Sequence, residues 1–223
     1  MSIVLVCGMG TESSLIGDKS TRVIQGTPAT IAVDLEAAIV AGGVTHILSW
    51  GTCGALDPAL PAGSLVVYRS VMGGNGDRVT ADGDWTSALA TLTGAVAVAA
   101  TAAPDTVFTA AAKAALFACT GASVVDLESY TAASIAAAHG LPCAGLRAVS
   151  DAADQDIPPA ALDALTKTGD INAWAAISGA FLNPSELPDL MALDASSQLA
   201  FSALARAEAD VGPTWGLPCQ AAT

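Results

Sequence analysis

Charged and aromatic residues are both scarce in this 223-residue chain, at 13% and 4% of the sequence. Lysine and arginine together number only 8, against 21 aspartates and glutamates, so the formal net charge is −13. Such a negative surface repels phosphate backbones, which excludes nucleic acid as an expected partner. Hydrophobic residues still reach 52%, which excludes a disordered chain and predicts a large core of closely packed, alanine-rich elements.

Paired cysteine motifs are absent. The cysteines are odd in number, widely spaced and without a C-x-x-C: Cys7, Cys53, Cys119, Cys143 and Cys219. This pattern argues against a disulfide framework and against a zinc site, so we expect no metal. Because most of these cysteines lie in apolar runs, we expect reduced thiols and a cytoplasmic protein.

Long apolar runs are absent as well. No segment has the ~18 apolar residues that a membrane span requires. The N-terminus carries no basic residues ahead of its short apolar run, so residues 2–7 predict a buried strand rather than a signal peptide.

What the chain does contain is an alternation of short apolar runs with helical patterns. Strands are predicted at residues 2–7, 21–25, 46–50, 64–68, 95–99, 123–125 and 142–149. Helices are predicted from residue 28, where Ile31, Leu35, Ala38 and Ile39 form one apolar face, over 110–119 and 128–139, and over most of the chain from 159, broken at Pro184, Pro188 and Pro213. We expect a turn-rich segment at 51–58 and a mobile loop at 72–84. The alternation predicts one α/β domain over residues 1–223, with a central mixed sheet flanked by helices.

Three acidic residues follow predicted strands. They are Glu12, Glu128 and Asp151. Ligands of open α/β sheets gather beyond the carboxyl ends of strands, so these carboxylates form a candidate acid/base set. The alternatives are structural: Glu12 and Glu128 could favour helix N-termini, and Asp151 could cap a helix.

The segments around these acids resemble the nucleoside phosphorylase and nucleosidase superfamily. Residues 49–58 (SWGTCGALDP) and 63–67 (GSLVV) are similar to its G-[ST]-A-G-G-L … GD signature, 125–129 (VDLES) to E/D-M-E-[SA], and 146–151 (LRAVSD) to R-x-I-S-D. Glu12, in residues 8–12 (GMGTE), stands where nucleosidases place an early glutamate. The resemblance implies a three-layer fold, a homo-oligomer such as a homodimer, and cleavage of the bond between a purine and a ribosyl group.

The resemblance also implies a role for each residue. Asp151 would protonate the purine at N7, and burial beside an apolar wall would let it hold that proton near neutral pH. Glu128 would bind the ribose hydroxyls, and Glu12 would activate the attacking water. The remaining candidate substrate-binding residues are Leu127, Thr52, Cys53, Gly54 and Ser150, the last also orienting Asp151. Arg147 is a candidate phosphate ligand, with an ion pair to a nearby carboxylate as the favoured alternative.

The last third of the chain is similar to the hopanoid-associated phosphorylases. Residues 182–190 (LNPSELPDL) and the DLES at 126–129 carry this likeness. It implies conversion of adenosylhopane to a ribosyl- or phosphoribosyl-hopane with loss of adenine. We expect segments 72–84 and 181–191, the latter with Phe181, Leu182, Leu187, Leu190 and Met191, to shape an apolar exit that would allow transient contact with a membrane.

The chain departs from the family in ways that bear on the nucleophile. Ser64 replaces the aspartate of GD, and the GDPxR phosphate loop of hexameric phosphorylases is missing. These departures weigh against phosphorolysis more than against purine cleavage. We expect no cofactor, with phosphate as the one candidate co-substrate.

Several other interpretations stay open. A methylthioadenosine- or adenosylhomocysteine-type nucleosidase and a purine nucleoside phosphorylase are the alternatives among enzymes of this superfamily. A dinucleotide-binding oxidoreductase is disfavoured because the glycines at 8 and 10 are followed by Ser13 rather than a third glycine. A nucleoside-binding module without catalysis would not need three carboxylates. Trp50 is expected to pack in the core or to line the pocket, and His46 and His139 to be structural.

Overall fold

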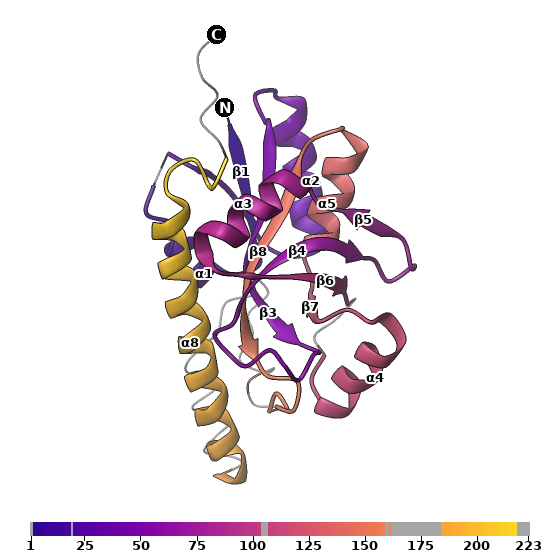
Figure 1. Ribbon diagram of the computed structural model, residues 1–223, viewed down its shortest axis with the longest axis vertical. Helices are drawn as coiled ribbons and strands as arrows, with labels where there is room; N and C mark the ends of the chain where they lie inside the picture. The colour runs from indigo at the N-terminus through magenta and orange to yellow at the C-terminus, as the bar shows by residue number, and fades with distance from the viewer. Residues whose placement is uncertain (1, 19, 104–106, 159–160, 162–183, 218–223) are drawn as a thin grey trace.

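The computed structural model describes residues 2–18, 20–103, 107–158, 161 and 184–217 (Figure 1). The strands are β1 (Ile3–Cys7), β2 (Arg22–Gln25), β3 (His46–Ala55), β4 (Leu65–Met72), β5 (Arg78–Thr80), β6 (Val96–Ala102), β7 (Val124–Asp126) and β8 (Cys143–Asp151). The helices are α1 (Gly10–Ser14), α2 (Pro28–Val40), α3 (Gly83–Thr93), α4 (Ala110–Thr120), α5 (Ser129–Ala138) and α8 (Leu187–Val211), with a 3₁₀ turn at Pro184–Glu186. The expected alternation of strands and helices is confirmed.

The strands form one mixed sheet that closes on itself at one end. Its order is β2-β1-β3-β7-β6-β4-β5, and β8 pairs with both β3 and β4. Strands β3, β8, β4, β6 and β7 therefore make a closed ring of neighbours. β2 runs parallel to β1, and both β1 and β8 run parallel to β3, whereas β7 is antiparallel to β3. The carboxyl ends of β1 and β8 thus meet at one edge of the sheet, beside β3.

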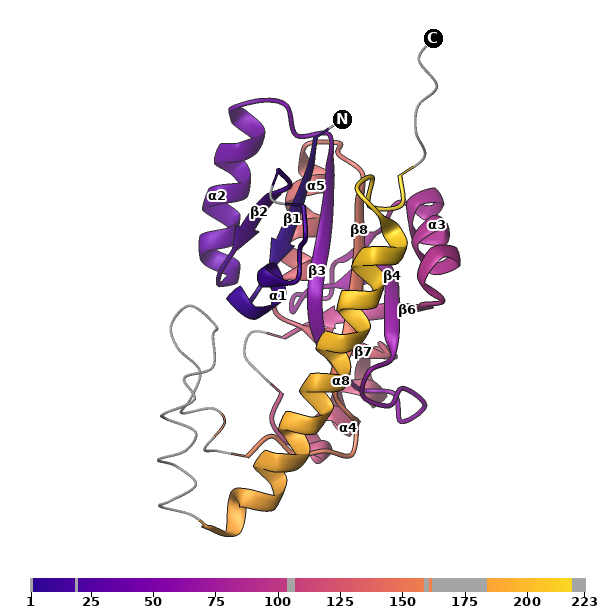
Figure 2. The same cartoon turned by 90° about the vertical axis from the view of Figure 1, so that its left-hand side faces the viewer.

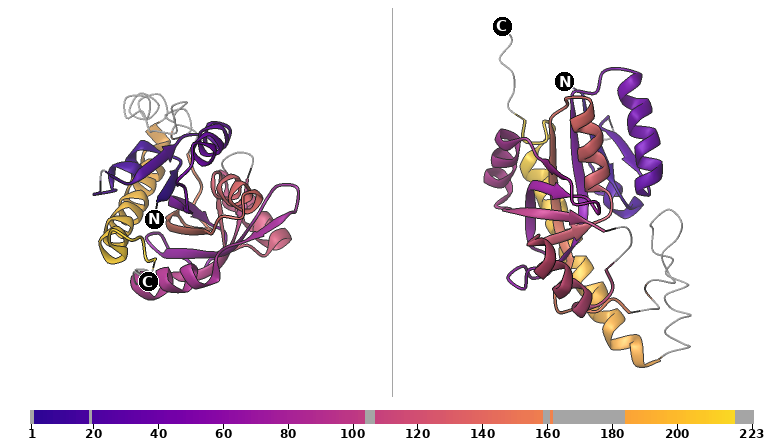
Figure 3. Two further views of the ribbon diagram at one scale, coloured as in Figure 1. Left: turned by 90° about the horizontal axis from the view of Figure 1, so that it is seen from above. Right: turned by 90° about the vertical axis from the view of Figure 1, so that its right-hand side faces the viewer.

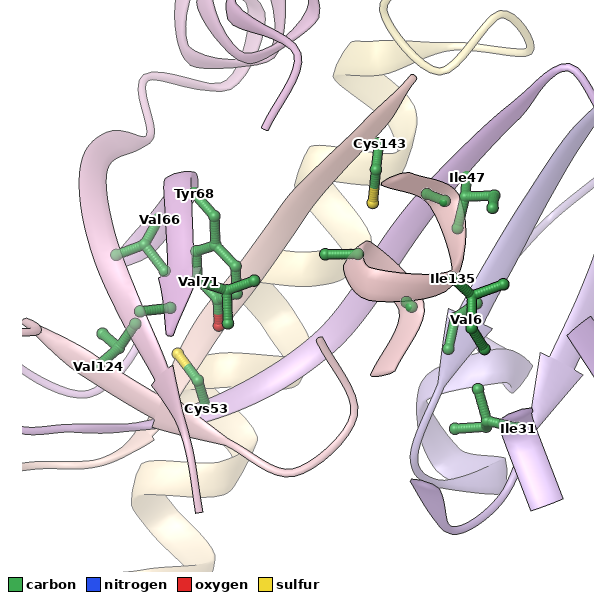
Figure 4. Packing of buried hydrophobic residues seen from close by; sticks show 14 of the residues in the cluster. Val6, Ile31, Ile47, Cys53, Val66, Tyr68, Val71, Val124, Ile135 and Cys143 are labelled. Atoms are coloured by element: carbon green, nitrogen blue, oxygen red, sulfur yellow. The ribbon is translucent and has the colours of Figure 1, made fainter. Parts of the chain in front are cut away.

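Two layers of helices cover the sheet, because successive side chains of a strand point to opposite faces. In β1, Val4 and Val6 pack into a core cluster with α2 and α5, and Leu5 and Cys7 pack into a second cluster with α3 and α8. Figure 4 shows part of the first cluster. Figures 2 and 3 show α8 running along one side of the sheet, with α2 on the other. This three-layer arrangement is the one expected.

Helix ends follow the signals in the sequence. Thr27 caps α2 by accepting the backbone N–H of Thr30, and Pro28 occupies its first turn. Asp82 caps α3 by accepting the backbone N–H of Trp85. α8 begins at Leu187, with Pro188 in its first turn where it needs no hydrogen-bond partner, and ends at Val211, just before Pro213; helix boundaries therefore lie at both prolines, as expected.

Two expectations about glycine-rich segments are wrong. Residues 51–55 continue β3 instead of forming a turn, because their backbone pairs with β8 and then with β7. Gly51 makes this continuation feasible at φ +143°, a conformation that L side chains rarely adopt. Residues 72–84 are not an irregular loop: they form the β4–β5 hairpin and the start of α3. Strand pairing, which glycine content does not reveal, decides both cases.

Trp50, His46 and His139 take structural roles. Trp50 is fully buried and its ring meets that of Trp215 edge-on, with centroids 5.2 Å apart. Trp50 is therefore a core residue, as expected, and its Nε1 donates to the backbone carbonyl of Glu12 at 3.4 Å. His46 packs against Trp85, and His139 contacts Glu36 at 2.8 Å. Trp174, Cys219, Phe181 and Leu182 lie outside the described residues.

Over the part of the chain that the structure describes, no helix combines the length and apolar character needed to cross a membrane.

Candidate active site

Glu12 lies in α1, directly beyond the carboxyl end of β1, and only 1% of it is exposed. Its Oε2 accepts the backbone N–H groups of Gly8 and Met9 at 3.0 and 3.1 Å. Its Oε1 accepts the backbone N–H and the hydroxyl of Thr52 at 2.7 and 2.8 Å. Glu12 thus supports the N-terminus of α1, which is the structural role expected as its alternative. It also joins α1 to the middle of β3. Four donors fix the orientation of the carboxylate.

Glu128 lies between β7 and α5 and is 9% exposed. Its side chain makes no cap hydrogen bond to α5; Asp126 does so, accepting the backbone N–H of Ser129 at 2.8 Å. The expectation that Glu128 only favours a helix N-terminus is therefore wrong. Its Oε2 instead lies 3.3 Å from Nη1 of Arg147, on β8.

The surroundings of Glu128 change its acidity. Burial raises the pKa of Glu128 to about 7, the carboxylates of Asp126 and Glu12 add to the rise, and Arg147 opposes it. The carboxylate is therefore charged only from near neutral pH upward. A negative charge held at this depth would stabilise a sugar that becomes cationic.

The two glutamates converge on Gly8. Glu12 accepts the Gly8 backbone N–H, and a Cβ added to Gly8 would lie 2.6 Å from Oε1 of Glu128. On the opposite side, a Cβ on Gly51 would overlap the carboxyl group of Glu12. Both glycines are therefore required for close approach, and they let two carboxylates from distant parts of the sequence meet.

Arg147 is 1% exposed and lies next to the two glutamates. Nη1 donates to the Thr52 carbonyl at 3.0 Å, Nη2 donates to Ser49 Oγ at 2.7 Å, and Nε lies 3.6 Å from Asp126. The ion pair favoured as the alternative for Arg147 is present, with both Glu128 and Asp126. The guanidinium is enclosed by these partners and orients Glu128.

Asp151 ends β8 and is 6% exposed. Ser150 Oγ donates to its Oδ1 at 2.7 Å, as expected for an orienting serine. Its Oδ2 lies 2.5 Å from Nζ of Lys113, on α4. Asp151 caps no described helix, because it belongs to a strand. The expected apolar wall is also wrong: the ammonium group of Lys113 lies against the carboxylate.

Strand β3 shows how the three acids are spaced. Thr52 bonds Glu12, and Gly54, two residues further along β3, pairs with Asp151 in the β3–β8 register. A Cβ on Gly54 would lie 3.0 Å from Oδ2 of Asp151, so the glycine leaves space there. Two residues of a strand span about 6–7 Å. Glu12 and Asp151 are thus spaced along one strand, with Glu128 beside Glu12.

Not every expected substrate contact is placed at the site. Thr52 faces Glu12, and Gly54 lies against Asp151. The Cys53 side chain points into the core with Tyr68 and Val124, as Figure 4 shows. The alternation of side chains along β3 requires this reversal. Burial raises the pKa of the Cys53 thiol, so it stays neutral. Leu127 is half-buried between Asp126 and Glu128.

Two features of the site were missed in the sequence. Asp126 accepts hydrogen bonds from the hydroxyls of Tyr68 and Ser129, both at 2.6 Å. These bonds orient the Asp126 carboxylate that pairs with Arg147. The spacing of Asp126 and Ser129 is a helix-start signal that could have found it. Lys113 was overlooked: the sequence signal is that it is the one charged residue of the alanine-rich segment 110–120, and only the structure shows that it is fully buried.

The family model described as "Phosphorylase superfamily" matches residues 2–177, which include every acid of this site. The chain belongs to the phosphorylase superfamily. As a member, it is an enzyme that cleaves a glycosyl bond. A comparison with curated proteins found no significant match.

Solved structures of this superfamily share the fold. The 5′-methylthioadenosine/S-adenosylhomocysteine nucleosidase of Helicobacter pylori, with butyl-thio-DADMe-Immucillin-A, superposes with a TM-score of 0.66 at 15% identity, covering 93% of this chain and 97% of that one. The futalosine hydrolase of the same organism gives 0.65 at 16% identity, covering 94% and 97%. The corresponding nucleosidase of Campylobacter jejuni gives 0.63 at 14% identity, covering 89% and 99%. The fold expected from the sequence motifs is therefore confirmed.

Proposed function

We propose that this enzyme hydrolyses the N-ribosidic bond of an adenine nucleoside. The observation that carries the proposal is the convergence of Glu12 and Glu128 at Gly8, with Asp151 of β8 paired to Gly54, two residues beyond Thr52 on β3. Such a set offers a base for water, a negative charge for the sugar and an acid for the purine. Glu12 follows β1, Glu128 follows β7 and Asp151 ends β8, so the three acids meet although they are far apart in the sequence.

In the proposed reaction each of the three acids has its own role. Glu128, held by Arg147, accepts the ribose hydroxyls and stabilises the positive charge that develops on the sugar. Glu12 takes a proton from the attacking water. Its four acceptor positions are already occupied, so one donor must yield, and the rotatable hydroxyl of Thr52 is the one free to do so. Asp151, oriented by Ser150, faces the purine.

Water is the nucleophile that the arrangement favours. Arg147 is enclosed by Glu128, Asp126, Ser49 and the Thr52 carbonyl, and it would have to leave these partners to bind phosphate. The superposed structures also carry the names of nucleosidases and a hydrolase. Phosphorolysis would require the phosphate to be held elsewhere.

For the 5′ substituent we propose the bulky apolar group of adenosylhopane. The β4–β5 hairpin supports this choice, because Gly73 packs against the ring of Tyr130, two residues after Glu128. It therefore lies near the ribose end. In the described tail, Leu187 and Met191 are exposed, at 47% and 66%. Ser196 of α8 bonds Gln155 beyond Asp151, so α8 lies nearer the base end and the hairpin is the better candidate for the exit.

5′-Methylthioadenosine is the second candidate substrate. A mutant of the H. pylori nucleosidase has been solved with 5′-methylthioadenosine in its active site, on the same fold. That structure superposes over 92% of this chain at a TM-score of 0.65.

Adenine release from purified protein tests the function. Asp151→Ala should abolish release, and Asp154→Ala, an exposed aspartate in the following turn, should leave it unchanged. Glu128→Gln should weaken ribose recognition and rate together. Near wild-type release by Asp151→Ala would count decisively against the assignment.

A competition assay decides the substrate and the nucleophile. Adenosine derivatives with bulky apolar 5′ groups should react in preference to methylthioadenosine and inosine, equally with and without phosphate. A clear preference for methylthioadenosine would assign the ordinary nucleosidase activity instead, and dependence on phosphate would assign a phosphorylase.

A further inference from the structure

Lys113 is the one residue of α4 that is fully buried, and its ammonium group points at the end of β8. Nζ lies 2.5 Å from Asp151 Oδ2 and donates to the carbonyls of Ala152 and Gln155, both at 2.8 Å. Three hydrogens thus meet three acceptors, all in the segment that begins with Asp151. The fold therefore places a buried cation against the residue proposed to serve the purine.

The other charged groups around this pair are engaged elsewhere. Asp156 accepts the backbone N–H of Ala110 at 2.7 Å, at the start of α4. Asp154 is exposed. Across β3, Asp126 and Arg147 pair with each other at 3.6 Å. The Lys113–Asp151 pair is therefore a separate unit, neutral as a whole, that contains one transferable proton.

This pairing poses a chemical problem for the leaving purine. An Asp151 carboxylate in an ion pair with an ammonium has no proton of its own to give. The purine must nevertheless gain a proton at N7 as it departs. The nearest proton is on Nζ, and a lysine ammonium can release one where an arginine guanidinium cannot.

We propose that Lys113 is a positioning residue that stores, next to Asp151, the proton taken up by the leaving purine. The inference rests on the function proposed above. As the bond between C1′ and N9 breaks, its electron pair goes to the purine. N7 takes a proton from the Asp151 carboxyl group, and Asp151 takes one from Lys113, which becomes a neutral amine. Water adds hydroxide to C1′ and gives its other proton to Glu12. Solvent then removes that proton and restores the ammonium, so the charges balance.

The pH dependence of kcat/KM for adenine release separates proton storage from simple support of the loop. A wild type that draws its proton from the pair should show a level kcat/KM from about pH 7 to about pH 9. In Lys113→Met, Asp151 alone must hold the proton. This variant should stay within about threefold of wild type near pH 6 and fall at least about tenfold below it near pH 9.

Lys113→Arg provides the discriminating comparison, because it keeps the cation but offers no transferable proton. It should be impaired at every pH. Arg206→Met, which removes an exposed cation on α8, should follow the wild-type profile. A Lys113→Met defect of equal size at every pH, with recovery in Lys113→Arg, would show that Lys113 only supports the loop.

The wild-type profile decides the matter by itself if the variants do not fold. A wild-type kcat/KM that already declines above pH 7 overturns the inference. The proposed function fails differently: the wild type then releases no adenine from any of the three substrate types at any pH.

Discussion

Gly8→Ala tests whether the two glutamates really share one small space. A methyl group on Gly8 would lie 2.6 Å from Oε1 and 2.9 Å from Cδ of Glu128, much closer than van der Waals contact. The backbone of Gly8 needs no positive φ, so the substitution acts through this overlap alone. The Glu128 carboxylate must move, and its 3.3 Å contact with Arg147 must lengthen.

The size of the effect follows from the packing. Forcing an extra methyl group into a filled site costs about 1–3 kcal/mol of unfolding free energy. We therefore expect Gly8→Ala to be destabilised by about 1–3 kcal/mol, and its kcat/KM to fall at least about tenfold, since about 1.4 kcal/mol of lost transition-state stabilisation suffices.

A double-mutant cycle with Glu128→Ala isolates the overlap. Without the Glu128 side chain the methyl group fits, so Gly8→Ala should then change the unfolding free energy by less than about 0.5 kcal/mol. Urea unfolding measures all four proteins, and Gly74→Ala, whose methyl group would meet nothing, serves as control. Additive effects of Gly8→Ala and Glu128→Ala, or a Gly8→Ala as stable and active as wild type, would refute the reasoning.

Three further predictions concern the glutamates. Glu12→Gln turns an amide NH₂ toward two N–H donors and loses two charge-assisted hydrogen bonds, so it should destabilise the fold by roughly 2–4 kcal/mol and lower kcat/KM by about 10²–10⁴-fold. An unfolding midpoint equal to that of Glu36→Gln, which alters only the half-buried partner of His139, would contradict this. Glu128 must be charged to act and its pKa is about 7, so kcat/KM should fall about tenfold per pH unit below 7. Because the folded pKa exceeds the ordinary 4.5, the unfolding free energy of Glu128→Gln should improve relative to wild type as the pH rises from about 4.5 to about 7. An unchanged difference between pH 4.5 and 7 would exclude a raised pKa.

Local sequence patterns were sufficient for most elements and for the identity of the acids. Apolar spacing at Ile31, Leu35 and Ala38 placed α2, and short apolar runs placed the strands. Glu12, Glu128 and Asp151 were found because each follows such a run. These features depend on neighbours a few residues away, where hydrophobic period and turn residues act.

Tertiary structure alone decided which groups surround those acids. Gly51 continues a strand instead of a turn because β3 pairs with β8 there, and Cys53 points inward because side chains alternate along a strand. Lys113 and Asp151 are far apart in the sequence, yet a helix beside the closed ring of strands brings them to 2.5 Å. The charge of a buried carboxylate depends on such distant partners, because electrostatic interactions in a low-dielectric interior follow distance in space and not in sequence.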